Sequence, residues 1–276
     1  MHKSSKIFLD ITNNIKPEIA LILGSGLNNF FDERDIIASI SYSDLPDFPQ
    51  TTVKGHGGKL ILGKINNVNV VCMYGRSHIY EGHEPAALAK PIRVLRDIGC
   101  KLLILTNAAG SLDEDMPPGS LMAITDHINL SGFNPLIGPN SDEYGSRFFD
   151  MTDGYNKKYR NQLITIAKNI DQKIYEGVYC MYSGPNFETP AEINASKILG
   201  VNAVGMSTVP EVLVANHCSL PVIAVSVITN LAAGLNKNKL SHQETLDNAG
   251  IAETNILNLL KKFIGEVKID DTSRNN

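Results

Sequence analysis

Residues 102–110 read LLILTNAAG, an apolar run that ends abruptly in small and polar residues. A short run rich in leucine and isoleucine is typical of a strand buried on both faces, as strands of a largely parallel sheet are. Comparable runs recur along the chain, and patterns with helical spacing lie between several of them. We therefore expect an α/β protein with a parallel or mixed sheet.

The individual elements follow from these patterns and from capping signals beside them. Helical spacing covers residues 85–98 and 155–170, and further helices are expected to begin at Thr189, Thr208 and Ser241, each followed three residues later by Glu. No linker, repeat or low-complexity tract is visible, so one domain is expected over residues 1–276, with 1–15 and 265–276 as peripheral ends. The expected strands are 19–23, 68–74, 102–106, 121–126, 178–181, 203–205 and 222–229.

Composition restricts the class of partner and the compartment. The chain has 276 residues, is 43% hydrophobic and carries a formal net charge of −4. Because Lys and Arg form no block or stripe, neither nucleic acid nor an anionic membrane is expected as a partner. The four cysteines are scattered without a CxxC pair, which is typical of a reduced, cytoplasmic protein. No signal peptide and no apolar segment of spanning length is seen, so we expect a soluble protein.

Small, polar or basic residues follow the carboxyl ends of the expected strands. These residues are GSG at 24–26, GRSH at 75–78, NAAG at 107–110, the Phe187-Glu188 pair, Met206-Ser207 and Asn230. In α/β folds, ligands bind at the carboxyl ends of strands. We therefore expect a site that is assembled from several loops.

Each of these segments also has an ordinary structural explanation. Two glycines around Ser25 can cradle a phosphate or simply form a tight turn, and the third glycine of a dinucleotide-binding fingerprint is missing. Arg76 and His78 can bind phosphate oxygens together or lie on a surface loop with a salt bridge. A metal site from His78, Glu81 and His83 fits no recognised ligand spacing.

The pair Phe187-Glu188 precedes a helix whose capping roles are filled by Thr189 and Glu192. The ring and the carboxylate are therefore available for another role, and together they suit a flat heterocycle that carries an N–H, such as a nucleobase. The alternative is an ordinary loop with a buried Phe and a solvated Glu. The glycine-flanked His56 suits a loop that closes on a ligand, or a hairpin turn. No GxSxG elbow is present, so a serine nucleophile is not expected.

Taken together and in this order, the motifs resemble those of the low-molecular-mass, trimeric purine nucleoside phosphorylases. The resemblance extends from about residue 21 to about residue 244. It implies a single α/β domain whose central mixed β-sheet closes partly into a barrel surrounded by α-helices. It also implies a homotrimer that splits the N-glycosidic bond of purine nucleosides with inorganic phosphate and uses no metal or organic cofactor. The motifs are LILGSGL (21–27), KGHGG (54–58), GRSHIYEGHEP (75–85), LTNAAGSL (105–112), DHINLSGFNPLIGPN (126–140), GPNFETPAEI (184–193), VGMSTVPEV (204–212) and ITNLAAG (228–234).

The same resemblance implies a role for each matching residue. Residues expected at the phosphate are Ser25, His56, Arg76, His78, Ala109 through its backbone N–H, and Ser207. Residues expected at the purine are Phe187, Glu188, Val204, Met206 and Asn230. Residues expected at the ribose are Tyr80, Tyr179, Met206, His242 and, from a neighbouring subunit, Phe148. His78, Glu188, Asn230 and His242 are the residues expected to take part in catalysis.

The implied reaction is phosphorolysis of 6-oxopurine ribosides and deoxyribosides, such as inosine and guanosine, to the free base and α-(deoxy)ribose 1-phosphate in purine salvage. A hydrolase, a nonenzymatic nucleoside-binding protein and a methylthioadenosine phosphorylase of the same superfamily are the alternatives. The set of Arg76, His78, Ser25 and Ser207 argues against the hydrolase. Asn230 and Ser207 stand where methylthioadenosine phosphorylases usually carry Asp and Thr, which favours the 6-oxopurine enzyme.

Overall fold

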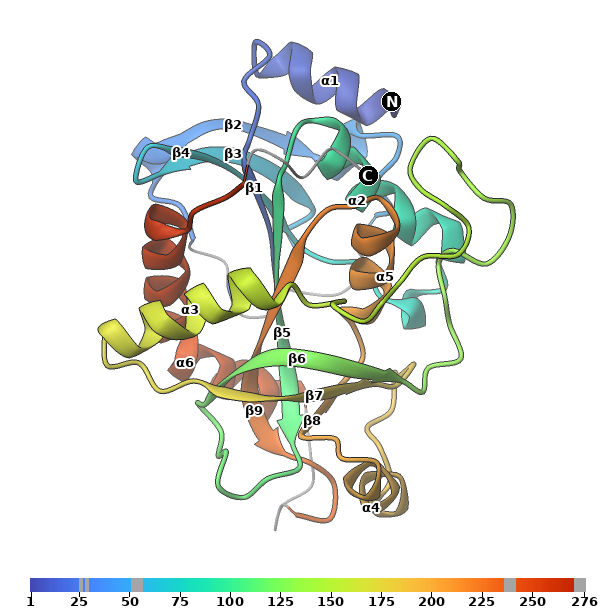
Figure 1. The fold of residues 1–276 in the computed structure, drawn as a ribbon, viewed down its shortest axis with the longest axis vertical. Helices are drawn as coiled ribbons and strands as arrows, with labels where there is room; N and C mark the ends of the chain where they lie inside the picture. Colours follow the sequence, from blue (N-terminus) through green and yellow to red (C-terminus); the bar gives the residue numbers. More distant parts are fainter. Residues whose placement is uncertain (25–26, 28–29, 51–56, 236–241, 271–276) are drawn as a thin grey trace.

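The computed structural model describes residues 1–24, 27, 30–50, 57–235 and 242–270 (Figure 1). For residues 242–247, 249 and 251 it describes the backbone alone. Over the described ranges, nine strands form one mixed sheet in the order β2-β3-β4-β1-β5-β8-β7-β6-β9. The strands are β1 (Ile19–Leu23), β2 (Ile36–Ser41), β3 (Lys59–Ile65), β4 (Val68–Tyr74), β5 (Leu102–Ser111), β6 (Leu121–Asn129), β7 (Tyr175–Met181), β8 (Ala203–Gly205) and β9 (Val222–Leu231).

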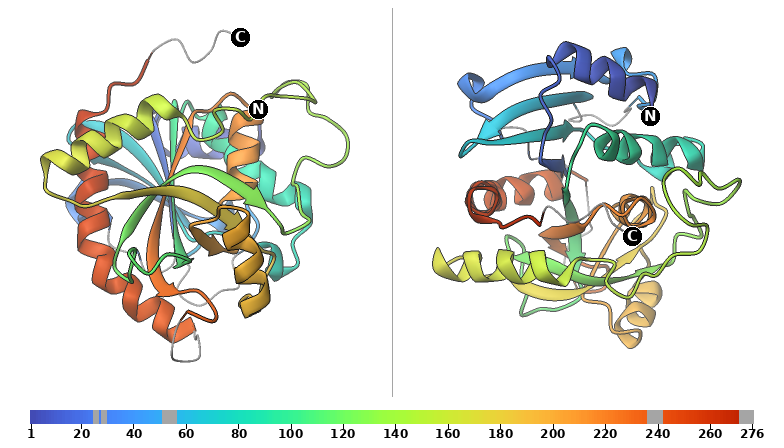
Figure 2. Two further views of the ribbon diagram at one scale, coloured as in Figure 1. Left: turned by 60° about the horizontal axis from the view of Figure 1, so that its bottom comes forward. Right: turned by 45° about the horizontal axis from the view of Figure 1, so that its top comes forward.

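Part of this sheet closes on itself. Strand β5 pairs with β8 and also with β9, and the path from β8 through β7 and β6 returns to β9. The pairs β5–β9, β6–β7 and β7–β8 are parallel, whereas β5–β8 and β6–β9 are antiparallel. These five strands form a barrel, and the other four extend from it as an open sheet (Figure 2). The predicted mixed sheet that closes partly into a barrel is confirmed.

Helices cover the sheet on two sides (Figure 1). Helices α2 and α5 pack together on one side, and α3 and α6 pack together on the other. The helices are α1 (Lys3–Ile11), α2 (Pro85–Asp97), α3 (Lys157–Asn169), α4 (Pro190–Ile198), α5 (Val209–His217) and α6 (His242–Glu266), with 3-10 turns η1 (Glu33–Asp35), η2 (Tyr42–Asp44) and η3 (Ile79–Glu81). In the portion of the chain that the structure describes, none of these helices combines the length and apolar character needed to cross a membrane.

Strand β5 separates two hydrophobic cores. Leu103 and Leu105 belong to the core that contains the buried faces of α2 and α5. Leu102 and Ile104 belong to the core that contains the buried faces of α3 and α6. Because successive side chains of a strand point to opposite faces, a strand with helices on both sides is apolar at every position. This double burial explains the uninterrupted LLIL run.

The capping pattern located the starts of α4 and α5 correctly but predicted the capping bonds correctly at only one of them. At α4, Thr189 Oγ1 accepts from the N–H of Glu192, and Glu192 Oε2 accepts from the N–H of Thr189, as predicted. At α5, however, Thr208 makes no side-chain cap and has φ 78°. Glu211, expected as its capping partner, instead forms an ion pair with Arg76. The polar side chains at this helix start contact residues from other elements and do not cap the helix.

Elements at the ends of the sheet were not predicted. Helix α1 lies within residues 1–15, which were expected to be peripheral, and its Phe8 is fully buried. Strands β2 and β3 form the antiparallel edge of the open sheet. β2 alternates partly buried and exposed residues, so its apolar signal is weaker than that of the central strands.

Candidate functional site

A cavity of about 330 Å³ lies where several strands end. Residues that follow β1, β4 and β7 line it together with the carboxyl-terminal parts of β5, β8 and β9. Ten of the predicted site residues meet here: Arg76, His78, Tyr80, Ala109, Phe187, Glu188, Val204, Met206, Ser207 and Asn230. The convergence of loops expected from the strand ends is therefore present in the fold.

The other five predicted residues are three whose side chains the structure does not describe and two that it describes outside the cavity lining. Ser25 and His56 lie outside the described residues. His242 is the first residue of α6, and its side chain is also outside the described part of the chain. Phe148 is 87% exposed and belongs to the long segment between β6 and α3. Tyr179 is fully buried on β7.

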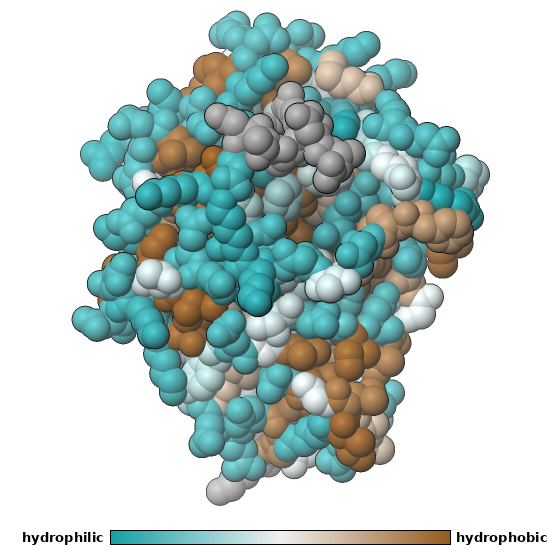
Figure 3. Space-filling view, viewed as in Figure 1, coloured by the Kyte–Doolittle hydropathy of each residue, from teal (hydrophilic) through white to brown (hydrophobic). Residues whose placement is uncertain are grey.

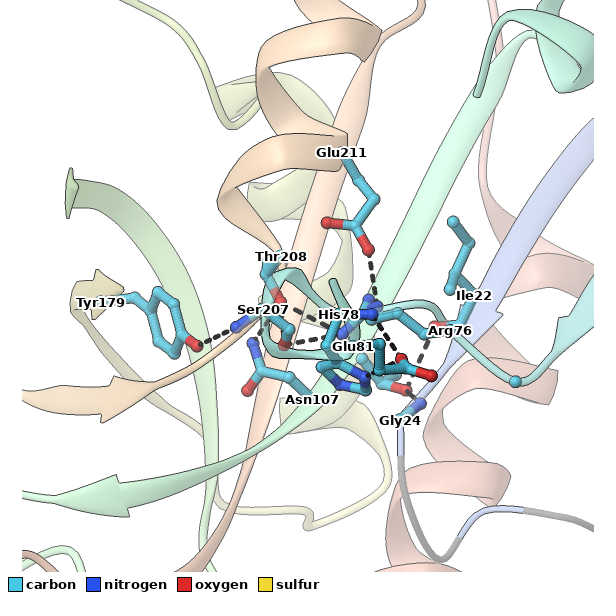
Figure 4. A network of polar contacts seen from close by, with 12 residues as sticks. Ile22, Gly24, Arg76, His78, Glu81, Asn107, Tyr179, Ser207, Thr208 and Glu211 are labelled. Atoms are coloured by element: carbon cyan, nitrogen blue, oxygen red, sulfur yellow. Dashed lines mark hydrogen bonds and ion pairs between the residues drawn. The ribbon is translucent and has the colours of Figure 1, made fainter. Parts of the chain in front are cut away.

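Arg76 lines the cavity and is held in place by a network of polar contacts (Figure 4). Its side chain is only 3% exposed, and its Nε lies 2.7 Å from Glu211 Oε1. Its NH1 donates to Ser207 Oγ at 2.9 Å and lies 3.4 Å from Thr208 Oγ1. A buried guanidinium with an ion-pair partner and fixed hydroxyl contacts is well placed to bind an anion in one orientation.

Thr208 has a strained backbone at the centre of this network. With φ 78° and ψ −49°, it lies in a region that β-branched residues rarely adopt. The N–H of Val209 donates to the carbonyl of Ser207 at 2.9 Å, which closes a γ-turn around Thr208. Asn107 Nδ2 donates to Thr208 Oγ1 at 2.8 Å. Strain of about 1–3 kcal/mol persists only where the surroundings fix the residue, and here Asn107 and Arg76 both contact the Thr208 hydroxyl.

Tyr179 supports the site from behind and does not line the cavity where ribose was expected to contact it. Its hydroxyl accepts from the N–H of Ser207 at 3.4 Å (Figure 4). A Cβ atom on Gly205 would lie 2.4 Å from this hydroxyl oxygen, so only glycine leaves room for the ring behind β8. Tyr179 therefore packs closely against Gly205 of β8 and is not among the residues that line the cavity.

His78 is oriented by Glu81. The ring Nδ1 lies 3.2 Å from Glu81 Oε1, which also accepts from the backbone N–H of His78 at 2.7 Å. The ring stacks on Tyr80 with centroids 4.7 Å apart. A carboxylate beside one ring nitrogen fixes the orientation of an imidazole. His83 completes no metal site with this pair: across the described residues, no three potential metal ligands gather.

A second end of the cavity lies farther along β5, where Asn230 is opposite Gly110, three residues beyond the Asn107 that contacts the Arg76 network. The carboxylate of Glu188 also lines the cavity. Glu188 is 7% exposed, and among the described residues its Oε1 has no hydrogen-bond partner. Burial raises the pKa of the Glu188 carboxyl. Asn230 Oδ1 accepts from the hydroxyl of Thr229 at 2.9 Å, and its Nδ2 donates to the carbonyl of Leu231 at 3.1 Å. An amide oxygen accepts two hydrogen bonds and an amide nitrogen donates two, so Asn230 keeps one of each for a ligand.

The rim of this end carries Phe187, which is 37% exposed. A ring, an unpartnered carboxylate oxygen and an amide can together contact the face and the polar edge of a planar heterocycle. The anion end and the heterocycle end share one cavity. The cavity therefore suits either one molecule that carries both an anionic group and a planar heterocycle, or two molecules that carry one each.

Thr208, Glu211 and Thr229 were not predicted as residues of the site, and Asn107 was expected only as part of the NAAG segment. Asn107, Thr208, Glu211 and Thr229 all belong to the network or to the cavity wall. Asn107 is 2% exposed, and its Oδ1 has no hydrogen-bond partner within the part of the chain that the structure describes. A polar residue at the end of an apolar strand is the sequence signal that could have identified Asn107 and Thr229. Thr208 and Glu211 carried the signal of a capping box instead.

Comparisons with known proteins agree with this geometry. The model of the Phosphorylase superfamily matches residues 18–265. Purine nucleoside phosphorylase 1 of Bacillus subtilis (strain 168) is 44% identical over 250 residues, which cover 91% of this chain and 92% of that protein. Purine nucleoside phosphorylase of Mus musculus is 44% identical over 239 residues, which cover 84% of this chain and 83% of that protein. The crystal structure of Schistosoma mansoni purine nucleoside phosphorylase in complex with inosine has a TM-score of 0.90 and 36% identity, and the match covers 97% of this chain and 96% of that chain.

The buried carboxylate of Glu188 is expected to cost stability. Its pKa is raised in the folded chain, so the ionised form is disfavoured there, and this cost disappears as pH falls through the folded-state pKa. Glu188→Gln should therefore raise the Tm at pH 8 by roughly 2–4 °C, as expected for relief of about 1 kcal/mol. The gain should shrink towards acid pH. Calorimetry from pH 5 to pH 8 measures it, with the exposed Glu114→Gln as the matched control. A Tm below that of the unmodified protein at pH 8 would contradict this account.

Proposed function

Because the chain belongs to the phosphorylase superfamily, among the purine nucleoside phosphorylases, we propose that it splits 6-oxopurine nucleosides with inorganic phosphate. The substrates are inosine, guanosine and their deoxy forms, and the products are the free base and α-(deoxy)ribose 1-phosphate. The observation that carries this proposal is that one cavity is lined both by Arg76 and by Glu188, whose Oε1 has no hydrogen-bond partner among the described residues.

Phosphate fits the end that contains Arg76. Arg76 supplies a charged donor, and Ser207 and His78 lie beside it on the cavity wall. Ala109 and its neighbour Ala108 line the same wall, and Ala108 is the more open of the two. Small residues allow the oxygens of a ligand to approach the backbone closely. Ser25 and His56 complete this set in our proposal.

The proposed reaction depends on the position of the phosphate more than on a covalent bond between the protein and the substrate. Breaking the bond between C1′ and N9 develops positive charge on the ribose and negative charge on the departing purine. A phosphate held beneath the sugar is the nucleophile and also stabilises the cationic centre, so its fixed position lowers the barrier. Attack from the face opposite the base inverts the anomeric carbon. The phosphate itself provides the nucleophile, and we propose no metal or organic cofactor.

The purine fits the end that contains Glu188 and Asn230. The second N–H of Asn230 can donate to O6, and its oxygen can accept from N7–H as charge enters the base. Glu188 can accept from N1–H, and from the 2-amino group of guanine. Structures of Schistosoma purine nucleoside phosphorylase contain inosine and guanosine, and another contains adenosine. The preference of this chain for 6-oxopurines therefore needs its own measurement.

We also place Phe148 in the site of a neighbouring subunit of a homotrimer. Its ring is 87% exposed and lies outside the cavity of its own chain. Ile137, in the same segment, is 75% exposed. Figure 3 shows further apolar side chains over α4, where Ile198 is 87% exposed and Leu199 is 54% exposed. Exposed apolar groups of this size favour association. The reaction belongs to purine salvage in the cytoplasm in this proposal.

A substrate assay tests the proposed reaction. Inosine, guanosine, adenosine and methylthioadenosine are each incubated with and without phosphate, and free base and sugar phosphate are measured. We expect inosine and guanosine to be split only when phosphate is present. Release of base without phosphate would identify a hydrolase, and preferred cleavage of methylthioadenosine would identify the other branch of the superfamily.

Asn230 is expected to set the preference for 6-oxopurines. The 6-amino group of adenosine would face the amide donor, a mismatch that costs roughly 1–3 kcal/mol, or about ten- to a hundredfold in kcat/KM. Asn230→Asp should lower the inosine-to-adenosine ratio of kcat/KM. The variant also loses the donor to the Leu231 carbonyl, so activity on both substrates should fall and the ratio is the informative quantity. An unchanged ratio would assign base selection elsewhere, with Glu188 as the next residue to test.

Phe148→Ala should raise the KM for inosine while sedimentation still shows a trimer. Co-expression with Glu188→Ala tests the shared site directly. The Phe148→Ala subunit keeps its own cavity, and the Glu188→Ala subunit can still provide its Phe148 ring to a neighbour. Mixed trimers should therefore be more active than the sum of the two variants. Activity equal to that sum, or a fully active monomer, would refute the shared site.

A further inference from the structure

Strand β9 contains a bulge beside the cavity. Its pairing with β5 runs in register up to Ala109 opposite Ile228 and resumes at Gly110 opposite Asn230, so the register passes over Thr229. Adjacent side chains of a regular strand point to opposite faces, and a bulge redirects one of them. Here the neighbours Thr229 and Asn230 both line the cavity.

The bulge fixes the orientation of the Asn230 amide. The hydroxyl of Thr229 donates to Asn230 Oδ1 at 2.9 Å, and Asn230 Nδ2 donates to the carbonyl of Leu231 at 3.1 Å. A carbonyl only accepts, so the atom facing Leu231 has to be the nitrogen. Which amide atom faces each part of the ligand therefore depends on the backbone at residues 229–231.

A residue of α6 holds this backbone. Asn248 Nδ2 donates to the carbonyl of Thr229 at 2.7 Å, a bond between residues 19 positions apart. Helix α6 packs against β9, and Asn248 is partly buried. Asn is a weaker helix former than Ala, so helix propensity does not explain its presence within α6. Its amide instead donates a hydrogen bond to the carbonyl of Thr229, the residue that the β5–β9 register passes over.

We infer that Asn248 is a positioning residue for base recognition. By holding the Thr229 carbonyl, it maintains the bulge that directs Thr229 and Asn230 into the cavity. Asn248 is not among the residues that line the cavity, so it acts through Asn230. This inference rests on the proposed function, because it assigns Asn230 to the purine. It also makes the start of α6 part of the machinery that reads the base.

Two variants separate this role from a general contribution to folding. Asn248→Ala removes the donor, and Asn248→Asp keeps the shape but sets a second acceptor against the carbonyl. We expect Asn248→Ala to raise the KM for inosine about five- to tenfold, and Asn248→Asp to raise it further. The KM for phosphate should change less than about twofold, because the bulge lies at the other end of the cavity. The inosine-to-adenosine ratio of kcat/KM should fall in both.

Asn255→Ala is the matched control, since Asn255 is an exposed residue of the same helix. It should leave both KM values and the substrate ratio unchanged. A purely structural role of Asn248 would lower Tm or the fraction of active protein and leave both KM values unchanged. Wild-type KM values and substrate ratio in Asn248→Ala and Asn248→Asp would overturn the inference.

Binding of hypoxanthine, measured by calorimetry, gives a readout that does not need turnover. The Kd should rise in Asn248→Ala and Asn248→Asp and stay constant in Asn255→Ala. If the unmodified protein binds hypoxanthine but does not use phosphate, the proposed reaction fails while the comparison of Asn248 variants still stands. If the unmodified protein binds no hypoxanthine, both proposals are wrong.

Discussion

Strand β5 changes its neighbour along one edge, and the position of the site follows from that change. Residues 102–105 pair with β1, whereas Gly110 and Ser111 pair with β8. Along its other edge β5 stays paired with β9 from Leu103 to Ser111. Between the two partners β1 and β8 a gap opens, and residues 107–110 line the cavity at that point. A site at the point where neighbouring strands diverge is a general property of α/β sheets.

Two features at the site lower the stability of the folded chain, although the rest of the fold is well packed. The Thr208 backbone is strained, and the carboxylate of Glu188 is buried without a partner for Oε1. Both features lie at the cavity or directly behind it, whereas the cores on either side of β5 consist of buried apolar residues. A large apolar core stabilises the fold enough to tolerate a few strained or buried polar groups. Such groups are concentrated at functional sites.

The sequence predicts the central architecture well because its signals are local. The LLIL run at β5 and the capping box at Thr189 depend on burial and on neighbours within four residues. Residues whose role depends on distant partners were misassigned. Glu211 was expected as a cap, yet its partner Arg76 lies 135 positions earlier in the chain. Tyr179 follows the strand pattern of β7, and only the fold shows that its hydroxyl contacts the N–H of Ser207 while the residue is not part of the cavity lining. Nothing in the spacing of residues indicates the bond between Asn248 and Thr229.

Among the described residues, two basic side chains lie at the anion end, and each faces a carboxylate: Arg76 faces Glu211 and His78 faces Glu81. Among the residues that the structure describes, this end therefore has little excess positive charge. An anion bound at this end gains affinity mainly from hydrogen-bond donors of fixed direction and little from net positive charge. The shape of the anion therefore matters more than its charge. A tetrahedral oxyanion offers several acceptor oxygens to such donors, whereas a halide offers charge without direction. The arrangement favours selective but readily reversible occupancy, and weak sensitivity to ionic strength follows from it.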